Sequence, residues 1–358
     1  MTQIKHPLKG RGTHLNPDNR FLVHGREAFD DGWDSAASED ETRPATELRI
    51  DRSRSVITYN RSPDVPFDRS INPYRGCEHG CVYCFARPSH ACLDCSPGLD
   101  FETKLFYKPD AAKLLEQELA ARRYRCQPIA LGVNTDAYQP CERRLGVTRS
   151  ILEVLHAARH PVSIITKSAL VERDLDLLAD MASQQLVHVM LSVTSLDRQL
   201  ARTLEPRAAA PQRRLQTLRT LSEAGIPVGV LLAPVIPVLN DYEIETILEQ
   251  VRKCGALEAA YVMLRLPHEV SALFRDWLVQ HVPGKARHVM NHIREMRGGR
   301  DNDSEFGSRM RGKGVFAELI RQRFRQAHKK LVFPGMPELS VEQFRPPSPG
   351  GQMGLFQG

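Results

Sequence analysis

The sequence contains no apolar run long enough to span a membrane and no dense set of cysteines that would build a disulfide scaffold. Its 358 residues are 41% hydrophobic and only 6% aromatic, and charged residues make up 26%. Eight cysteines in a chain of this length are too sparse for a disulfide framework. The first residues, Met1 to Pro7, lack the apolar centre of a signal peptide. We therefore expect a cytoplasmic protein with no membrane-spanning segment, whose thiols stay reduced.

Several common catalytic constellations are absent too. The sequence shows no P-loop, no Ser/His/Asp set, no paired carboxylates and no internal repeat. What it has instead is an uneven charge distribution. The net charge is +6, but residues 285–330 alone hold thirteen Lys or Arg against five Asp or Glu. Such a segment is either a solvated basic face or a phosphate-binding surface built from arginines among glycines, with Arg297, Arg300, Arg309, Arg311 and Lys313 as its candidates.

The strongest chemical signal is the spacing of three cysteines, Cys77-x3-Cys81-x2-Cys84. Soft sulfur donors select iron–sulfur clusters or zinc over harder metals. Three thiolates this close can hold three irons of a cubane [4Fe–4S] cluster, which leaves the fourth iron open to a small molecule. The alternative is a structural zinc site, because Cys81-x2-Cys84 and Cys92-x2-Cys95 together could supply four thiolates. The seven residues between these pairs are fewer than the common four-cysteine zinc pattern uses.

The rest of the chain alternates short apolar runs with amphipathic segments, which predicts an α/β fold. Each run is continuous and bounded by polar residues, Pro or Gly, as in buried parallel strands. With the loop of the three cysteines following the first strand, the pattern predicts a partial, six-stranded (β/α)6 barrel of the TIM type, with its chemistry at the carboxyl ends of the strands. The expected strands are at 70–74, 128–133, 162–166, 187–193, 227–233 and 260–264, with a further short strand within 47–60.

We expect four regions along the chain. Residues 1–60 form an N-terminal extension without a core of its own, and residues 61–268 form the barrel. Residues 269–333 form a helical, basic region, in which 269–280 and 315–324 have helical periodicity. Residues 334–358 are rich in Pro and Gly and read as a flexible tail.

The cysteine spacing, with an aromatic residue just before Cys84, resembles the signature of the radical SAM superfamily. Further segments resemble its spore-photoproduct-lyase-like branch, whose members are often labelled DNA repair photolyases. The resemblance covers roughly residues 10 to 330, and four of its five segments fall at the end of an expected strand. The segments are Asn72 to Cys77, Asn134 to Pro140, Ile165 to Ser168, Ser192 to Asp197, and Glu205 to Arg207.

The resemblance implies both cofactors of that family, a [4Fe–4S] cluster and S-adenosyl-L-methionine. Cys77, Cys81 and Cys84 would ligate the cluster, and Tyr83 would lie close to the adenine. A one-electron reductant of the flavodoxin or ferredoxin type would reduce the cluster. Reductive cleavage of S-adenosylmethionine would then give a 5′-deoxyadenosyl radical that abstracts hydrogen from the substrate.

The same resemblance implies contacts to the rest of the cofactor. Thr135 and Asp136 would contact its methionine end, and Lys167 would pair with its carboxylate. Ser192 and Thr194 would hydrogen bond the carboxylate or the ribose hydroxyls. The alternative for each of these residues is a purely structural role, because Lys, Ser and Thr after strands are often exposed or cap helices.

One position departs from the family. The lyase that reverses spore photoproduct uses a cysteine as hydrogen-atom donor three residues before the aspartate matched by Asp136, and here that residue is Val133. A valine side chain cannot donate a hydrogen atom as a thiol does. The resemblance therefore does not extend to the hydrogen-atom donor of thymine-lesion reversal, and Cys141, five residues beyond Asp136, is the candidate donor for a different substrate geometry.

We expect a lyase-like radical SAM enzyme that acts on nucleic acid, in DNA repair or modification. Two alternatives stay open: radical chemistry on a protein or metabolite, and a zinc-containing nucleic-acid-binding protein that is not an enzyme. Iron content and 5′-deoxyadenosine formation separate the last from the others, and salt-dependent DNA binding separates the first two.

A prediction concerns the C-terminal residues. Gln352, Leu355 and Phe356 resemble the short peptide by which bacterial repair and replication proteins dock on the DNA sliding clamp. Leu355 and Phe356 would fill an apolar pocket while Gln352 hydrogen bonds at its edge. In a calorimetric titration with the cognate clamp, the full chain should bind and a chain ending at Pro349 should not. Equal binding by both, or none by either, would exclude this docking.

Overall fold

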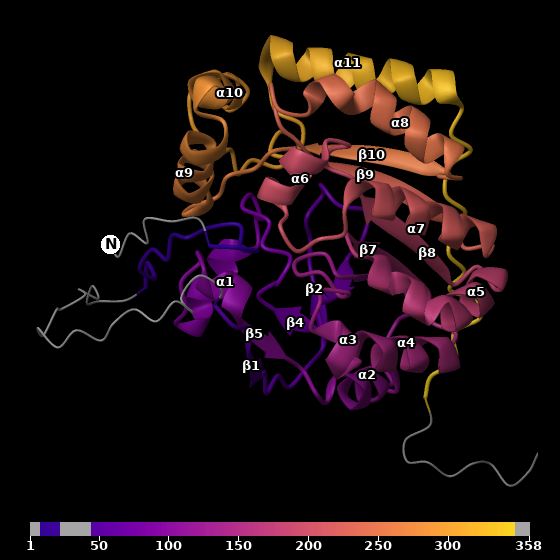
Figure 1. The fold of residues 1–358 in the computed structure, drawn as a ribbon. Coiled ribbons are helices and arrows are strands. Elements are labelled where there is room, and N and C mark those ends of the chain that lie inside the picture. The colour runs from indigo at the N-terminus through magenta and orange to yellow at the C-terminus, as the bar shows by residue number, and fades with distance from the viewer. Residues whose placement is uncertain (1–7, 22–43, 348–358) are drawn as a thin grey trace, which may run out of the picture.

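Short runs of aliphatic residues form the buried strands of one curved sheet in the computed structural model, which describes residues 8–21 and 44–347 (Figure 1). The sheet has the order β10-β9-β8-β7-β6-β3-β2. Neighbouring strands from β3 to β10 are parallel, and β2 pairs antiparallel with β3. The strands are β2 (Ile57–Tyr59), β3 (Arg69–Ile71), β6 (Ile129–Leu131), β7 (Val162–Thr166), β8 (Val187–Ser192), β9 (Val228–Val235) and β10 (Glu258–Met263).

The six parallel strands confirm the predicted partial barrel. Their order in the sheet follows their order in the chain, as expected for successive β/α units. In the part of the chain that the structure describes, β10 and β2 are the two ends of the sheet and do not pair, so the barrel is open between them. Along β7 and β8 buried and half-buried side chains alternate, so one face is fully covered and the other partly covered, and both favour apolar residues.

The first predicted strand, 70–74, is divided between two sheets. Its second part, β4 (Tyr74–Arg75), joins a small sheet of order β1-β5-β4 with β1 (Glu47–Ile50) and β5 (Lys104–Tyr107). Pro73 separates the two parts, and proline has no N–H with which to continue the ladder. Because β4 leads directly into Gly76 and Cys77, this small sheet anchors the cysteine loop.

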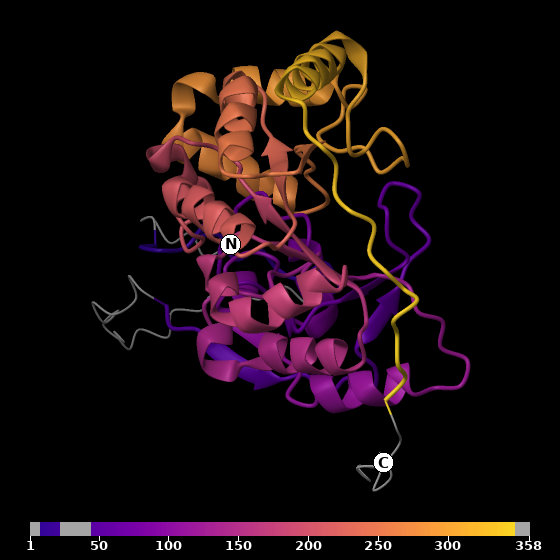
Figure 2. The ribbon, with the colours of Figure 1, turned by 90° about the vertical axis from the view of Figure 1, so that its right-hand side faces the viewer.

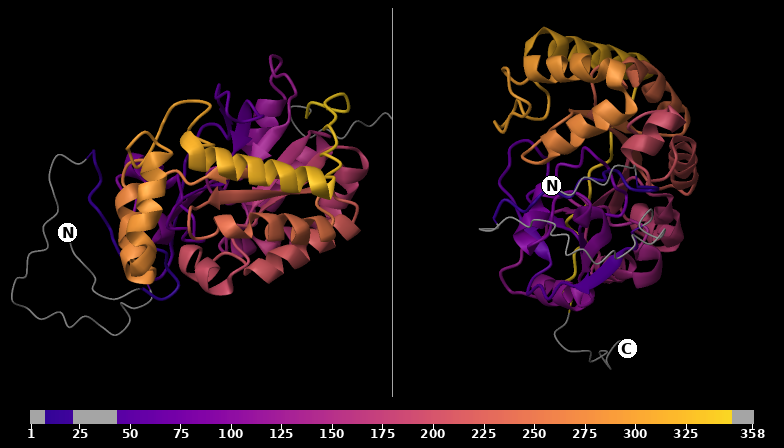
Figure 3. Two further views of the ribbon diagram at one scale, coloured as in Figure 1. Left: turned by 90° about the horizontal axis from the view of Figure 1, so that it is seen from above. Right: turned by 60° about the vertical axis from the view of Figure 1, so that its left-hand side comes forward.

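Amphipathic helices cover the outer face of the large sheet (Figures 1 and 3). The apolar stripe of α4, which includes Val147, Ile151 and Leu155, is buried as predicted. Helix α7 ends just before Gly225, whose φ of +77° is the left-handed conformation expected after a helix C-terminus. The helices of the barrel are α1 (Asp100–Thr103), α2 (Ala111–Leu119), α3 (Glu142–Leu145), α4 (Val147–Ala157), α5 (Leu175–Ser183), α6 (Arg198–Leu204), α7 (Pro211–Glu223) and α8 (Ile244–Lys253).

Three further helices follow the barrel: α9 (Val270–His281) and α11 (Gly314–Leu331) contain the two predicted helical stretches 269–280 and 315–324 almost completely, and α10 (Pro283–Glu295) was not predicted. Helices α9 and α10 pack against each other, and α11 lies beside α8 (Figure 1). Within the described ranges, no helix combines the length and the apolar character that crossing a membrane requires. Short 3-10 helices lie at Arg87–Leu93, Ala169–Asp174 and Asp241–Glu243.

Residues 334–347 differ from the flexible tail that their Pro and Gly content predicts. They run as an extended strap from α11 across the amino-terminal edge of the sheet (Figure 2). Backbone N–H groups of Gly335, Ser340 and Arg345 donate to carbonyls of residues 257, 185 and 158, which precede β10, β8 and β7. Local composition cannot predict these contacts, because their partners are far away in the sequence. The predicted clamp peptide, with Gln352, Leu355 and Phe356, lies outside the described residues.

The strap is fastened by one aromatic side chain, which gives a stability prediction. The half-buried Phe344 ring lies 5.6 Å from Tyr124 and 5.3 Å from His160, measured between ring centroids. Phe344→Ala should lower the free energy of unfolding by about 1–2 kcal/mol, less than for a fully buried phenylalanine. Urea unfolding followed by circular dichroism measures it. Val315→Ala, at an 82% exposed position, is the control and should change stability by less than about 0.5 kcal/mol; equal effects of the two changes would contradict the strap's role.

Candidate functional site

The three cysteines lie on a loop that follows β4 at the carboxyl ends of the parallel strands. The Cys77 N–H donates to the Phe101 carbonyl over 2.9 Å, and the Cys84 N–H donates to the Cys81 carbonyl over 3.2 Å. Gly76 and Gly80 bracket Cys77 with φ values of +77° and +67°, a conformation that favours glycine. The loop is therefore shaped by its own glycines and by backbone contacts to the residues of α1.

Cys77, Cys81 and Cys84 lie close together and are not in disulfides. Cys77 and Cys81 are buried, and Cys84 is half-buried. Burial, and then the neighbouring Asp136 and the other two thiols, raises the pKa of Cys77 well above its ordinary value. Burial also raises the pKa of Cys81 to about 12. Such a set of soft donors fits an iron–sulfur cluster, in which each sulfur binds a different iron.

The zinc alternative depends on a second pair of cysteines. Cys92 is exposed and Cys95 is buried, on and just after the 3-10 helix Arg87–Leu93. Within residues 8–21 and 44–347, no three His, Cys, Asp or Glu side chains are arranged to hold a single metal ion. A tetrahedral zinc site needs four ligands around one ion, and this arrangement does not provide them. The metal content of the purified protein decides between the zinc alternative for Cys81, Cys84, Cys92 and Cys95 and an iron–sulfur cluster.

A buried ion pair between Arg87 and Glu102 contacts the cysteine loop. Arg87 and Glu102 are both fully buried, and the Arg87 Nε also donates to the Cys81 carbonyl over 2.9 Å. Glu102 accepts from the Gly12 N–H over 2.8 Å, which brings residues 8–21 against the loop. A Cβ at residue 12 would lie 1.7 Å from the Gly80 carbonyl oxygen, so only glycine allows this approach. The N-terminal extension thus packs on the cysteine loop although it has no core of its own.

Asp136 connects the cysteine loop to the ends of β6 and β7. Its carboxylate accepts from the Lys167 N–H and the Thr166 hydroxyl, each over 2.7 Å, and lies 3.4 Å from the His79 imidazole. Burial works to raise the pKa of Asp136, but His79 and these hydrogen bonds outweigh it and lower that pKa to about 2. Thr135 is buried beside it, and its hydroxyl donates to the Tyr74 carbonyl over 2.6 Å. Both predicted residues therefore lie at the loop, with their polar atoms held by protein groups.

Glu205 forms a second connection, on the other side of the cysteines. The Tyr83 hydroxyl and the Arg214 guanidinium both donate to its carboxylate, and the Thr194 hydroxyl donates to it over 2.7 Å. Burial works to raise the pKa of Glu205, but Arg214 and Lys167 outweigh it and lower that pKa to about 2. Because this pKa lies below that of an unfolded glutamate, the stabilisation is present above about pH 4.3 and is lost as the pH falls towards 2.

The remaining predicted cofactor residues surround Glu205. Lys167 is half-buried beside Cys81 and Glu205, where burial lowers and these two neighbours raise its pKa, with a net upward shift. Ser192 is buried, and its carbonyl accepts from Arg214 over 3.0 Å. The sequence predicts no role for Glu205, which belongs to the family-like segment Glu205 to Arg207. The signal that could have identified it is a lone acidic residue directly before Pro206.

Cys141 lies at the start of α3, within the main hydrophobic core and close to Glu78. Burial, and then Glu78 and Glu142, raises its pKa well above the ordinary value, so the thiol stays neutral and keeps its hydrogen.

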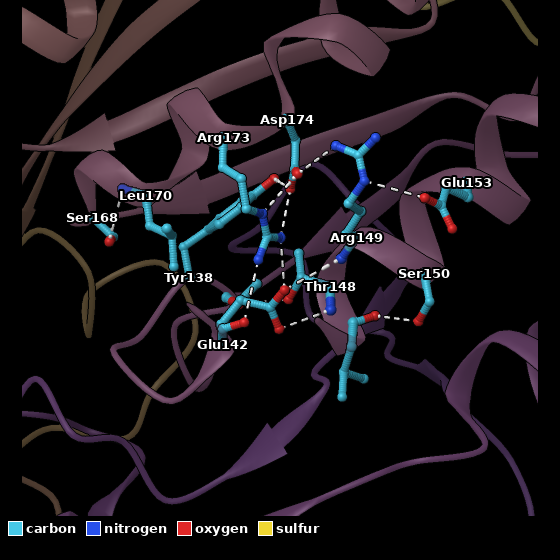
Figure 4. Close-up of polar contacts among 12 residues, drawn as sticks. Tyr138, Glu142, Thr148, Arg149, Ser150, Glu153, Ser168, Leu170, Arg173 and Asp174 are labelled. Atoms are coloured by element: carbon cyan, nitrogen blue, oxygen red, sulfur yellow. Dashed lines mark hydrogen bonds and ion pairs between the residues drawn. The ribbon is translucent and has the colours of Figure 1, made fainter. Parts of the chain in front are cut away.

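The neighbouring Glu142 accepts from the Tyr74 hydroxyl, from Arg173 over 2.7 Å and from the Thr148 N–H over 2.9 Å, as Figure 4 shows in part. Tyr138 donates to Asp174 over 3.0 Å in the same network (Figure 4). The loop from residue 132 to Cys141 is thus held rigidly.

Several basic side chains of the segment 285–330 already bind other groups of the protein. Arg297 is only 2% exposed and donates to the carbonyls of residues 264 and 308, so it cannot contact a phosphate and that part of the prediction is wrong. Arg309 pairs with Asp64, and Lys313 with Glu305. Arg300 and Arg311 are exposed and form no ion pair with any residue that the structure describes.

Comparison with known proteins gives one family and several relatives. The family model described as "Radical SAM superfamily" matches residues 71–251, about half of the chain. An uncharacterized protein of Mycobacterium tuberculosis is 38% identical over 221 residues, which cover 61% of this chain and 65% of that protein. An uncharacterized protein of Methanocaldococcus jannaschii is 32% identical over 173 residues, covering 48% and 62%. The match thus spans less than two thirds of these relatives' length.

Among solved structures, a spore photoproduct lyase complexed with dinucleoside spore photoproduct has a TM-score of 0.58 and 14% identity. The superposition covers 80% of this chain and 79% of that chain. At this identity the similarity shows a shared fold. It confirms the fold predicted from the strand pattern.

The buried pair of Glu205 and Arg214 gives a further prediction. Glu205→Gln leaves a buried guanidinium without its counter-charge, which should lower the free energy of unfolding by about 3 kcal/mol or more. Urea unfolding of the full chain measures this change. Glu47→Gln is the matched control, because Glu47 pairs with Arg49 at the surface and its loss should leave the unfolding midpoint unchanged. A Glu205→Gln variant as stable as the wild type would show that the pair is not a structural requirement.

Proposed function

This chain belongs to the radical SAM superfamily, and we propose that it acts on nucleic acid. Membership makes it an enzyme whose cofactors are a [4Fe–4S] cluster and S-adenosylmethionine. The proposal for the site rests on one observation: three free thiols lie together on a glycine-shaped loop at the carboxyl ends of the strands.

Cys77, Cys81 and Cys84 hold the cluster in this proposal. When bound, the cluster and S-adenosylmethionine supply a 5′-deoxyadenosyl radical that removes a hydrogen atom from the substrate. The protein's own contribution is to fix the ligands, exclude water and position charge. Asp136 and Glu205 do this by fixing the loops on either side of the cysteines, since each accepts hydrogen bonds from at least two segments of the chain.

The same geometry supports roles for the other predicted residues. Lys167 carries a positive charge beside Cys81 and is the candidate partner for the cofactor carboxylate. Tyr83 and Thr194 are held in place by Glu205 and would face the adenine and ribose, with Ser192 next to them. Thr135, beside Asp136, would contact the methionine end. Because Val133 cannot donate a hydrogen atom, the neutral thiol of Cys141 is the candidate donor to a substrate radical.

The choice of nucleic acid, in DNA repair or modification, is supported by three observations. The spore photoproduct lyase that shares the fold is described with a dinucleoside ligand. The segment 285–330 is strongly basic, and its Arg300 and Arg311 remain exposed. A protein or metabolite substrate is the alternative, which no described feature favours. An iron–sulfur cluster of this kind also suits the reducing cytoplasm and a flavodoxin or ferredoxin as reductant.

Cluster loading provides the test of this function. After anaerobic purification and reconstitution, the wild type should contain iron and sulfide and should form 5′-deoxyadenosine when dithionite is added. Alanine in place of Cys77, Cys81 or Cys84 should abolish both, because three ligands are the minimum for the site. The double variant Cys92→Ala/Cys95→Ala is the matched control and should retain the cluster. Loss of all iron in that double variant, with zinc in the wild type, would refute the assignment.

A further inference from the structure

The two ends of the open sheet meet at the mouth of the barrel through a side-chain contact. Phe85 follows Cys84 on the loop after β3 and β4, and Arg265 lies two residues beyond the end of β10. These strands are at opposite ends of the parallel part of the sheet. The guanidinium carbon of Arg265 nevertheless lies 5.4 Å from the centre of the Phe85 ring. We call this line of contact between the ends of the sheet the seam.

The segment before α11 extends the seam. Arg309 lies over the ring of Phe306, with 4.4 Å between its guanidinium carbon and the ring centre. Asp64, in the loop between β2 and β3, pairs with Arg309 and accepts from the Gly307 N–H over 2.6 Å. Figure 2 shows that loop rising towards the segment before α11. Two arginines and two phenylalanines are thereby held along the opening of the barrel, starting next to a predicted cluster ligand.

The positive charge of Arg265 has no carboxylate partner among the described residues. It is half-buried, its Nε is buried without a hydrogen-bond partner, and it forms no ion pair within the described residues. The nearest carboxylate, Asp64, is already used by Arg309 and Gly307. Burial, and then the positive charge of Arg309, lowers the pKa of Arg265. Partly burying an uncompensated cation is unfavourable, so an anionic ligand bound here would offset an existing cost.

Both phenylalanines keep a large exposed surface. Phe85 is 44% exposed and Phe306 is 60% exposed, although each already has an arginine over one face. Exposed aromatic faces alternating with cations are the means by which proteins hold single-stranded nucleic acid, with bases stacked on the rings and phosphates at the cations. In a duplex the base faces are covered by their neighbours, so these rings could contact bases only in an unstacked strand.

We propose that Phe85, Arg265 and Phe306 bind a single nucleic-acid strand along the seam, with a phosphate at Arg265 and bases against the two rings. The proposal rests on the proposed function and names the form of the substrate. It places an unstacked base next to the cysteine loop, where hydrogen abstraction would occur. Arg309 and Asp64 position Phe306 and are not themselves contacts.

The experiment measures binding of a fluorescein-labelled single-stranded deoxyoligonucleotide of about 12 nucleotides. The full chain, anaerobically reconstituted, is titrated by fluorescence anisotropy at several salt concentrations. Arg265→Gln should weaken binding about tenfold and reduce the steepness of log Kd against log salt by about 0.7. Arg265→Lys should keep the wild-type salt dependence, since it keeps the charge. Phe85→Leu and Phe306→Ala should each weaken binding about tenfold without changing the salt dependence.

Arg122→Gln is the matched control, because Arg122 is exposed, unpaired among the described residues and lies in the loop before β6, at the amino-terminal edge of the sheet. It should bind like the wild type. If the wild type binds and the Arg265 and Phe306 variants bind equally well, the seam is not the contact surface although the proposed function stands. If the wild type binds no nucleic acid, or a phosphopeptide more tightly, the nucleic-acid function itself fails. Tighter binding of a duplex than of the single strand would overturn the single-strand proposal.

Discussion

Buried carboxylates hold the functional edge of this protein together. A buried carboxylate is costly unless its oxygens accept several hydrogen bonds or meet a cation. Glu102, Asp136, Glu142 and Glu205 all meet this requirement by binding segments that are far apart in the chain. Glu102 connects the N-terminal extension to the cysteine loop, Asp136 connects that loop to β7, and Glu205 connects it to α7. The loops at the mouth are thus fixed to one another as well as to the sheet.

The sheet positions the strands and the buried carboxylates position the loops, so that one loop holds its three cysteines in a single arrangement. The parallel sheet brings the ends of six strands to one edge, because every crossover returns to the same side. Apolar packing fixes the strands, and a second apolar cluster that includes Val82, Ile236 and Leu266 packs the loops. The carboxylates supply directional contacts there, and each contact fixes a backbone N–H or a side chain to a specific oxygen. Rigid positioning of ligands is what a metal site needs.

Most of the barrel could be predicted from the sequence, and the contacts between its loops could not. Each predicted parallel strand appears within a few residues of its expected bounds, because a buried strand needs a continuous apolar run. Helix α10 was not predicted, and two features with distant partners were not predicted either: β5, and the contact of Gly12 with the cysteine loop. Both depend on partners dozens of residues away, and local pattern carries no information about such partners. The strap was read as a flexible tail for the same reason.

In the candidate site too, the sequence predicts local geometry but not the contacts between distant segments. The spacing of Cys77, Cys81 and Cys84 identifies chemistry, because three ligands within eight residues are fixed by local geometry. The role of Glu205 is set by Tyr83, Thr194 and Arg214, which come from different elements. Likewise the burial of Arg297 follows from carbonyls that it meets only in the folded chain.

The open sheet has a consequence for how a long polymer could reach the mouth of the barrel. In a closed ring of strands, a chain could enter the interior only by threading one of its ends. Here the ring is completed along the seam by side chains rather than by a ladder of backbone hydrogen bonds. Side-chain contacts can separate and re-form without unpairing a strand. A polymer that enters sideways through such a seam needs no free end, so its interior positions are as accessible as its termini.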